Sequence, residues 1–342
     1  MRRLLPEWHP QWGVLLAWPD ARTDWADALE DTQSCYQDLL SAILGHERVL
    51  LVCRDAQSAD AVRERLRAAD IGVDRLHTVI ADYDDTWTRD FGPITVQQDG
   101  QPLLLDFRFT GWGGKFGSAN DDALNAALPW SAEREAVDLV LEGGAIDTDG
   151  QGTLLTTRAC LLNPNRNPSF NLAELEAGLK KQLGVERIWW LENGYLEGDD
   201  TDAHVDTLAR FVNPRTIAYV QCQDRDDDHY PALAAMEREL QALADAHGLT
   251  LVALPMAVPQ YNAEGERLPA TYANFLITNR AILVPTYRCA TDAAALDALG
   301  AVAGERLVVG VPCRALIEQH GSLHCVTMQL PEGVLDPTFT EE

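Results

Sequence analysis

The sequence predicts an α/β fold in which one unit, a two-stranded hairpin followed by a helix and a single strand, occurs five times in a closed array. The first observation is that short apolar strands and amphipathic helices recur in this order along nearly the whole chain. The second is that the apolar segment 323–330 has no partner after it, whereas the strand 13–18 can complete its hairpin. Because this pairing would remove exposed strand edges, we expect one domain, 1–342.

Turn residues mark the predicted hairpins. The Asp99-Gly100 step in the first hairpin is typical of a tight turn, and Asn213-Pro214 separates the strands of the third. A fifth unit combines 323–330 and 13–18 with a helix at 24–45 and a strand at 48–53. In each of the four continuous units, the hairpin comes first, the helix second and the single strand last. Their expected ranges are 93–107, 118–127 and 138–142; 145–157, 171–183 and 186–191; 205–222, 231–248 and 249–255; and 273–287, 291–303 and 306–312.

Segments rich in acidic residues, glycine and histidine lie just before or within the first strand of each hairpin. In a closed array, equivalent positions meet near the central axis, so residues far apart in sequence can share one site. These segments are DDTWTRDFGP (84–93), LEGGAID (141–147), GDDTDAHVD (198–206), ATYANF (270–275) and HGSLHC (320–325).

Composition and charge restrict the class of protein. A hydrophobic content of 46% and a charged content of 23% are typical of a soluble globular chain, and no apolar run approaches the roughly 20 residues of a membrane-spanning helix. The formal net charge of −26 argues against nucleic acid and anionic membranes as partners and favours a cationic ligand. The seven cysteines include no C-x-x-C pair, and no signal peptide is evident, so we expect a cytoplasmic protein without disulfides.

Cys325, in HGSLHC, is the candidate nucleophile, although a buried cysteine on a strand is the plainer interpretation. If 323–330 is a strand, His324 and Cys325 face opposite sides, so His324 is a poor candidate for the base. His204, in GDDTDAHVD, is a better candidate, and on a strand it would share a face with Asp206. The alternative for this second segment is a solvated acidic loop.

No metal is expected. A calcium loop starting at Asp200 would need glycine and glutamate where Val205 and Phe211 stand. The sequence also contains no H-E-x-x-H pair for zinc.

Two tryptophans and two further acids complete the candidate set. Asp90 could grip a cation beside the aromatic wall of Trp87, although an Arg89–aspartate salt bridge and a core tryptophan are the plain alternative. Trp112 lies in the glycine-rich segment FTGWGGKF (109–116), which can approach a ligand closely or move as a lid. Glu142 ends a strand and is either a plain strand-end acid or a hydrogen-bond partner of the catalytic imidazole.

Taken together, the five segments and WHPQWGVLLAWP (8–19) resemble the agmatine deiminases, which are grouped with the bacterial peptidyl-arginine deiminases in the guanidine-modifying superfamily. The resemblance covers about residues 6 to 331 and implies a five-bladed, pseudo-fivefold α/β propeller of ββαβ units. It also implies roles for seven residues: Cys325 as nucleophile, His204 as acid/base, Asp90 and Asp206 as the carboxylates that hold the guanidinium, Glu142 as the acid that orients the histidine, and Trp87 and Trp112 as aromatic walls of the substrate slot.

Two segments depart from the common pattern of these enzymes. Many read GGGNIHC before the nucleophile and FNAWGG in the glycine-rich loop, where this chain has HGSLHC and FTGWGG. Both segments are expected near the substrate, so the departures bear on which guanidinium compound is used rather than on the nucleophile.

The resemblance implies hydrolysis of agmatine to N-carbamoylputrescine and ammonia, without a cofactor. We expect the Cys325 thiolate to form a covalent thiouronium, His204 as imidazolium to protonate the departing ammonia, and neutral His204 then to activate water. The open alternatives are a deiminase of free or peptidyl arginine, an amidinotransferase, a metal-dependent hydrolase and a non-catalytic propeller that binds cations. A homodimer is left open.

Overall fold

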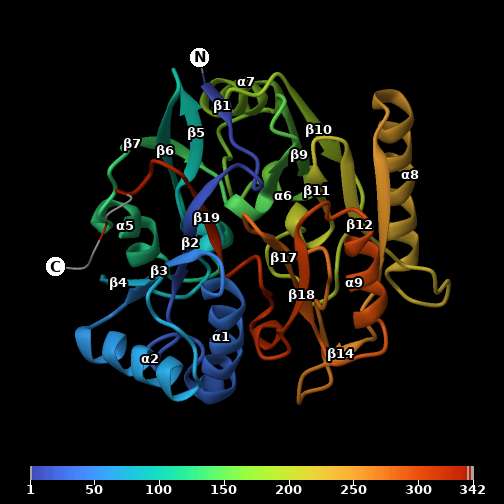
Figure 1. Cartoon of the computed structure of the whole chain (residues 1–342). Helices are drawn as coiled ribbons and strands as arrows, with labels where there is room; N and C mark the ends of the chain where they lie inside the picture. Colours follow the sequence, from blue (N-terminus) through green and yellow to red (C-terminus); the bar gives the residue numbers. More distant parts are fainter. Residues whose placement is uncertain (1, 337–338, 340–342) are drawn as a thin grey trace.

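The computed structural model describes residues 2–336 and 339, and within them the strands form five separate sheets of three or four strands and one small hairpin (Figure 1). The fold is therefore mixed α/β, as predicted. In the first four predicted units, two antiparallel strands are followed by a helix that returns the chain to a third strand parallel to the second. The long helices α2, α7 and α8 lie at the periphery in Figure 1, outside the strands.

The bounds of these four units agree with the prediction to within a few residues, except at one strand. That strand, β7, begins at Glu133 rather than at 138. The units comprise β5 (Ile94–Gln98), β6 (Gln101–Arg108), α5 (Ala119–Ala127) and β7 (Glu133–Val140); β8 (Ile146–Thr148), β9 (Thr153–Thr157), α6 (Arg158–Leu161), α7 (Leu172–Leu183) and β10 (Arg187–Leu191); β11 (Ala209–Asn213), β12 (Thr216–Gln221), α8 (Tyr230–His247) and β13 (Thr250–Pro255); and β16 (Leu276–Ile277), β17 (Ala281–Thr286), α9 (Asp292–Gly300) and β18 (Leu307–Pro312).

The fifth sheet joins the two ends of the chain. Strand β19 (Met328–Pro331) pairs antiparallel with β2 (Gln11–Ala17), as predicted, and β2 pairs parallel with β3 (Arg48–Cys53) after helix α1 (Leu29–Leu44). Every residue of β2 is buried, which is typical of a strand covered on both faces. Helix α2 (Ala56–Ala68) and strand β4 (Leu76–Ile80) extend this sheet by one strand that was not predicted.

Several short elements were also not predicted. Strand β1 (Arg2–Leu4) pairs with β5, and β14 (Gln260–Tyr261) pairs with β15 (Arg267–Leu268). The remaining short helices are α3 (Thr88–Phe91), α4 (Gly111–Gly114), η1 (Ala26–Ala28), η2 (Gly143–Ala145), η3 (Val205–Thr207) and η4 (Leu316–Gln319). Among the described residues, no helix is both long and apolar enough to cross a membrane.

Two predicted strand segments are wrong, and both carry candidate site residues. His204 directly precedes η3, Asp206 lies within it, and the strand begins only at Ala209. Residues 323–327 form a turn before β19. There, the Thr327 hydroxyl bonds to the carbonyls of Leu323 and His324, and the backbone N–H of His324 donates to Asn274, so these groups are satisfied without a strand ladder.

Candidate active site

The candidate residues gather at a pocket of about 400 Å³. Four of the seven, Trp87, Asp90, Trp112 and Cys325, line it. His204, Asp206 and Glu142 are buried and lie against the same group of residues rather than in the pocket wall. Six aspartates contribute to the lining, and they are Asp24, Asp84, Asp85, Asp90, Asp121 and Asp200.

Gly144 is the point at which three of the candidate side chains converge. A Cβ atom at this position would lie 2.7 Å from Nδ1 of His204, 2.8 Å from Oδ1 of Asp90 and 3.1 Å from Oδ2 of Asp206. The Gly144 backbone N–H donates to Asp90 Oδ1 at 2.9 Å. The glycine therefore lets the imidazole and both carboxylates approach one stretch of backbone, which any side chain would prevent.

Cys325 lies in the turn before β19, with 7% of its surface exposed. Asn274 fixes this turn: its Oδ1 accepts from the Cys325 backbone N–H at 3.3 Å and lies 3.4 Å from the thiol. Burial raises the pKa of the Cys325 thiol well above its usual value, and the charges of Asp206 and Asp90 raise it further. The thiol is therefore protonated before a cation binds. Although ATYANF was singled out, the part played by Asn274 was not predicted.

Asp90, in α3, is held by two donors. Its Oδ1 accepts from Gly144, and its Oδ2 accepts from the Trp112 indole N–H at 2.9 Å. Burial, followed by the charge of Asp206, raises the pKa of Asp90 well above its usual value. The alternative considered for this segment was a salt bridge between Arg89 and an aspartate. Instead, Arg89 donates to Gln329 at 2.6 Å and lies 3.5 Å from Glu7.

The two tryptophans are buried and line the pocket. Trp87 donates to Asp85 Oδ2 at 3.2 Å. Trp112 has φ 55° and ψ 44°, a left-handed conformation that is unusual for a bulky residue. Such backbone strain, on the order of 1–3 kcal/mol, persists where surrounding contacts fix it and is often found at functional sites.

His204 precedes η3 and is 1% exposed. Its Nδ1 lies 3.6 Å from Asp90 Oδ1, and its Nε2 has no hydrogen-bond partner among the described residues. Burial lowers the pKa of His204 to about 3; Arg166 and Lys115 add to this effect, while Asp206 and Asp202 oppose it. The imidazole is therefore neutral in the free site, and the imidazolium expected to protonate the departing ammonia must form during the reaction.

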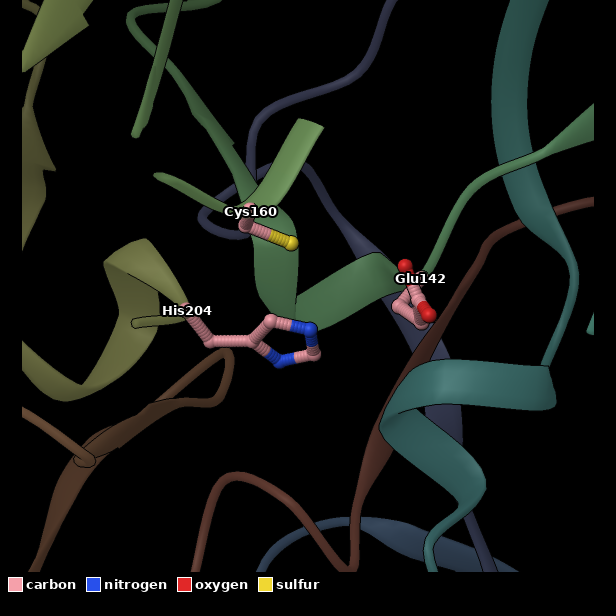
Figure 2. Close-up of side chains that lie close together, drawn as sticks. All are labelled: Glu142, Cys160 and His204. Atoms are coloured by element: carbon pink, nitrogen blue, oxygen red, sulfur yellow. The ribbon is translucent and has the colours of Figure 1, made fainter. Parts of the chain in front are cut away.

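Glu142 does not make the predicted hydrogen bond to His204. Its Oε1 accepts from Arg166 Nε at 2.6 Å, and its Oε2 has no partner in the described part of the chain. Figure 2 shows the His204 imidazole extending toward this carboxylate and toward the thiol of Cys160. Burial raises the pKa of Glu142 although Arg166 opposes the shift.

Arg166 is a site residue that the sequence did not reveal. Its side chain is completely buried, and it donates to Asp202 at 2.7 Å and to the Trp112 carbonyl at 2.9 Å. It thereby connects Glu142 to the loop that carries Trp112. Nothing in the segment around it, LNPNRNPS (162–169), distinguishes this arginine from one on a surface loop.

Cys160, His204 and Glu142 form a cluster that bears on metal binding. One ligand-type atom from each lies within 4.8 Å of the others, and thiolate, imidazole and carboxylate are the ligands zinc uses. The sequence predicted no metal site, and it did not reveal this cluster. The buried Arg166 guanidinium on Glu142 opposes a cation, so these groups are better described as the surroundings of His204 than as a metal site.

Asp206 is paired with His324, the histidine that the sequence made a poor candidate for the base. His324 Nδ1 lies 2.8 Å from Asp206 Oδ2, and Nε2 lies 2.7 Å from Glu7 Oε2. The other Asp206 oxygen, Oδ1, is buried and has no partner among the described residues. His324 lines a separate cavity of about 40 Å³, whereas Cys325 lines the pocket. The two side chains therefore face different cavities, as expected, although the segment is not a strand.

This arrangement can bind and attack a flat cation. Asp206 offers an unpartnered carboxylate oxygen, Asp90 offers a second carboxylate, and the indoles of Trp87 and Trp112 line the pocket. A thiol and a neutral imidazole supply a nucleophile and a base. These are the components of nucleophilic catalysis on an amidine or guanidinium carbon.

The comparisons with known proteins agree with this chemistry. Residues 3–331 match the family described as Porphyromonas-type peptidyl-arginine deiminase. The agmatine deiminase of Pseudomonas aeruginosa is 36% identical over 96% of this chain and 95% of that protein. A C. jejuni agmatine deiminase structure, a cysteine-to-serine variant with substrate bound, is 37% identical over 98% of this chain and 97% of that one, with a TM-score of 0.91.

A third relative carries a different name. A Porphyromonas gingivalis structure, provisionally called an arginine deiminase, is 45% identical over 98% of this chain and 100% of that one, with a TM-score of 0.90. These matches span nearly the full length of both chains. The chain therefore belongs to the Porphyromonas-type peptidyl-arginine deiminase family, with relatives that include named agmatine deiminases.

Proposed function

We propose that this chain is an agmatine deiminase, a hydrolase that converts agmatine and water to N-carbamoylputrescine and ammonia. The observation that carries the proposal is the convergence of Asp90, His204 and Asp206 on Gly144, next to a pocket that Cys325 lines. Relatives named agmatine deiminases support it over nearly the whole chain.

The protonation states indicate how the first half of the reaction proceeds. The guanidinium binds between Asp90 and Asp206, and its charge lowers the pKa of the Cys325 thiol. His204, neutral in the free site, accepts the thiol proton as sulfur bonds to the guanidinium carbon. The resulting imidazolium gives that proton to the departing nitrogen, so the carbon–nitrogen bond breaks and ammonia leaves a covalent thiouronium. The imidazolium thus arises during the reaction.

Water completes the cycle. His204, neutral again, removes a proton from water as the oxygen bonds to the thiouronium carbon. The carbon–sulfur bond then breaks as the carbonyl forms. The Cys325 sulfur takes the proton held by His204, the hydroxyl proton passes to solvent, and the neutral ureido product leaves. These steps use only the Cys325 thiol, the His204 imidazole and water.

The charges of the pocket favour agmatine over arginine. Agmatine carries a free amine at its far end, whereas arginine carries a carboxylate as well. Six aspartates line the pocket, against two basic side chains among its described lining residues, Lys115 and His320. Lys115 is already paired with Asp202 at 3.0 Å. A carboxylate would therefore meet repulsion where an amine meets attraction.

An ammonia-release assay across agmatine, arginine, peptidyl arginine and methylarginines tests the proposal. We expect agmatine to have a kcat/KM at least about 100-fold above arginine, as expected when one ligand charge changes from paired to repelled. Cys325→Ala and His204→Ala should each abolish release, whereas Cys222→Ala, a buried cysteine outside the pocket, should retain it. Full activity in Cys325→Ala would overturn the mechanism, and preferred release from arginine would support the name given to the P. gingivalis relative.

The larger organisation is proposed on related grounds. We infer a single five-bladed propeller, supported by five sheets of similar strand order and by site residues drawn from separate units. A cytoplasmic location agrees with seven free cysteines, and a homodimer remains open to a measurement of mass in solution.

A further inference from the structure

We propose that His324 is a positioning residue, held as an imidazolium between Asp206 and Glu7, that fixes the Asp206 carboxylate so that Oδ1 alone faces the guanidinium. The proposal rests on the proposed function, because it assigns a role toward the same substrate group. Asp206 binds substrate, and His324 acts through Asp206.

The geometry requires two protons on or beside the His324 ring. Nδ1 and Nε2 lie 2.8 Å and 2.7 Å from the oxygens of Asp206 and Glu7, and neither distance suits a ring lone pair facing a carboxylate. Either the ring carries both protons, or one of the carboxyls does.

The surroundings favour the ring. Glu7 Oε2 also accepts from Arg210 at 2.7 Å, and its Oε1 accepts from the Ile277 backbone N–H at 2.5 Å. Although burial opposes it, the charges of Arg210 and His324 lower the pKa of Glu7 strongly. The carboxyl of Glu7 therefore remains ionised and cannot supply the second proton.

Asp206 is ionised for a similar reason. Burial would raise its pKa, but the hydrogen bond and charge of His324 outweigh burial and lower the pKa of Asp206. Burial, followed by Arg210 and Arg89, lowers the pKa of His324 below its usual value, although the charge of Glu7 and the hydrogen bond to Asp206 oppose this shift. We assign the two protons to the ring on geometry, against that shift, because both ring nitrogens lie within 2.8 Å of carboxylate oxygens and Glu7 already accepts from Arg210 and from the Ile277 N–H.

The backbone around His324 is fixed independently of its ring. The His324 N–H donates to Asn274 Oδ1 at 2.8 Å, the oxygen that also meets Cys325, and the Asn274 amide donates to the Asp206 carbonyl at 3.4 Å. Asn274 thus joins the two segments even when the ring is replaced. The contact that the His324 ring itself makes with a candidate substrate-binding residue is the one to Asp206 Oδ2.

A pair of amide substitutions separates the two contacts of the ring. The amide nitrogen of asparagine can take the place of Nδ1, and that of glutamine the place of Nε2. His324→Asn therefore keeps the donor to Asp206, and His324→Gln keeps the donor to Glu7. We expect the Kd of agmatine, measured calorimetrically in the Cys325→Ala background, to rise on the order of 10- to 100-fold for His324→Gln and less than about 5-fold for His324→Asn.

His229 provides the matched control. It is buried outside the pocket, with Nδ1 2.7 Å from Asp227 and Nε2 accepting from the Glu197 backbone N–H at 2.8 Å. His229→Gln should leave agmatine affinity unchanged. In the enzyme with Cys325 intact, His324→Gln should raise KM more than it lowers kcat, because Asp206 holds the substrate throughout the reaction.

The outcomes are distinguishable. Equal affinities of the Asn and Gln variants would overturn the proposal, as would a nitrogen NMR spectrum of histidine-labelled protein in which either His324 nitrogen lacks a proton at pH 7. If the unsubstituted enzyme released no ammonia from agmatine, the proposed function would fail, whereas the NMR measurement would still decide the state of His324.

Discussion

The indole N–H of Trp112 donates to Asp90 Oδ2 at 2.9 Å, and the backbone of Trp112 itself is in the left-handed conformation. The strained loop and the carboxylate are thus fixed together. Because the second Asp90 oxygen is held by Gly144, this carboxylate has little freedom to reorient when a substrate arrives.

Trp112→Phe should therefore weaken substrate binding while retaining the aromatic wall. Loss of a hydrogen bond to a charged group costs about 1.5–3 kcal/mol, so KM for agmatine should rise roughly 10- to 100-fold. Steady-state kinetics measures the effect. Trp130→Phe is the control, because the Trp130 indole donates to the Asn125 carbonyl at 2.8 Å outside the pocket. Equal KM values for the two variants would contradict the role given to Trp112.

Gly144→Ala should abolish activity with a modest loss of stability. Its Cβ would meet side-chain atoms of His204 and Asp90, which can shift, whereas a Cβ at Gly143 would lie 2.2 Å from the Arg89 carbonyl oxygen. Thermal unfolding and ammonia release should therefore separate the two variants: kcat falls at least about 100-fold in Gly144→Ala, and Tm falls further in Gly143→Ala. Gly178→Ala, with nothing near its Cβ, is the control. An active Gly144→Ala enzyme would contradict the proposed convergence.

Substrate binding should release protons. Burial and the charge of Asp206 raise the pKa of Asp90 well above its usual value, and a guanidinium beside it lowers that pKa again by favouring the ionised form. In Cys325→Ala, where the thiol cannot contribute, we expect release of up to about one proton per agmatine at pH 7. Calorimetry in two buffers of different ionisation enthalpy measures it. Proton uptake on binding would contradict the assignment.

The KM for agmatine should rise as the pH falls from 8 to 6. Burial raises the pKa of Asp85 to about 7 and that of Asp121 to about 8, and both line the pocket. Below these values the carboxyls are protonated and no longer attract an amine. Asp85→Asn should raise KM at pH 8 and flatten its dependence on pH; an unchanged profile would remove Asp85 from amine recognition.

Chelators should leave the enzyme active. Although Cys160, His204 and Glu142 offer zinc-type ligands, Arg166 already occupies one Glu142 oxygen at 2.6 Å. We expect full ammonia release after dialysis against EDTA, with metal analysis of the same sample. Activity lost on dialysis and restored by zinc would assign the cluster to a metal.

The sequence was informative where its patterns are local or repeated. Hairpin and helix periodicity located four units, and the unpartnered strand 323–330 led to the pairing of β19 with β2. Strand β1 escaped notice because three residues are too few to show alternation. The turn at 323–327 was misassigned because its backbone groups are satisfied by Thr327 and Asn274 rather than by a neighbouring strand.

The candidate site was predicted as a set of residues but not as a network. Asp90, His204 and Asp206 do converge, yet Arg166, Asn274 and the pairing of His324 depend on contacts across more than 20 residues that no spacing reveals. The protonation states of His204 and Cys325 could not be predicted from the sequence either. Burial makes His204 neutral and keeps the Cys325 thiol protonated, and burial is a property of the folded chain.

The pairing of β19 with β2 has a consequence for the order in which the protein is made. Cys325 lies three residues before β19, which is the last strand in the described part of the chain, whereas its partner β2 is synthesised long before it. The candidate carboxylates and the imidazole are therefore synthesised before the proposed nucleophile. A chain in which β19 has not yet paired with β2 should accordingly be inactive toward guanidinium compounds.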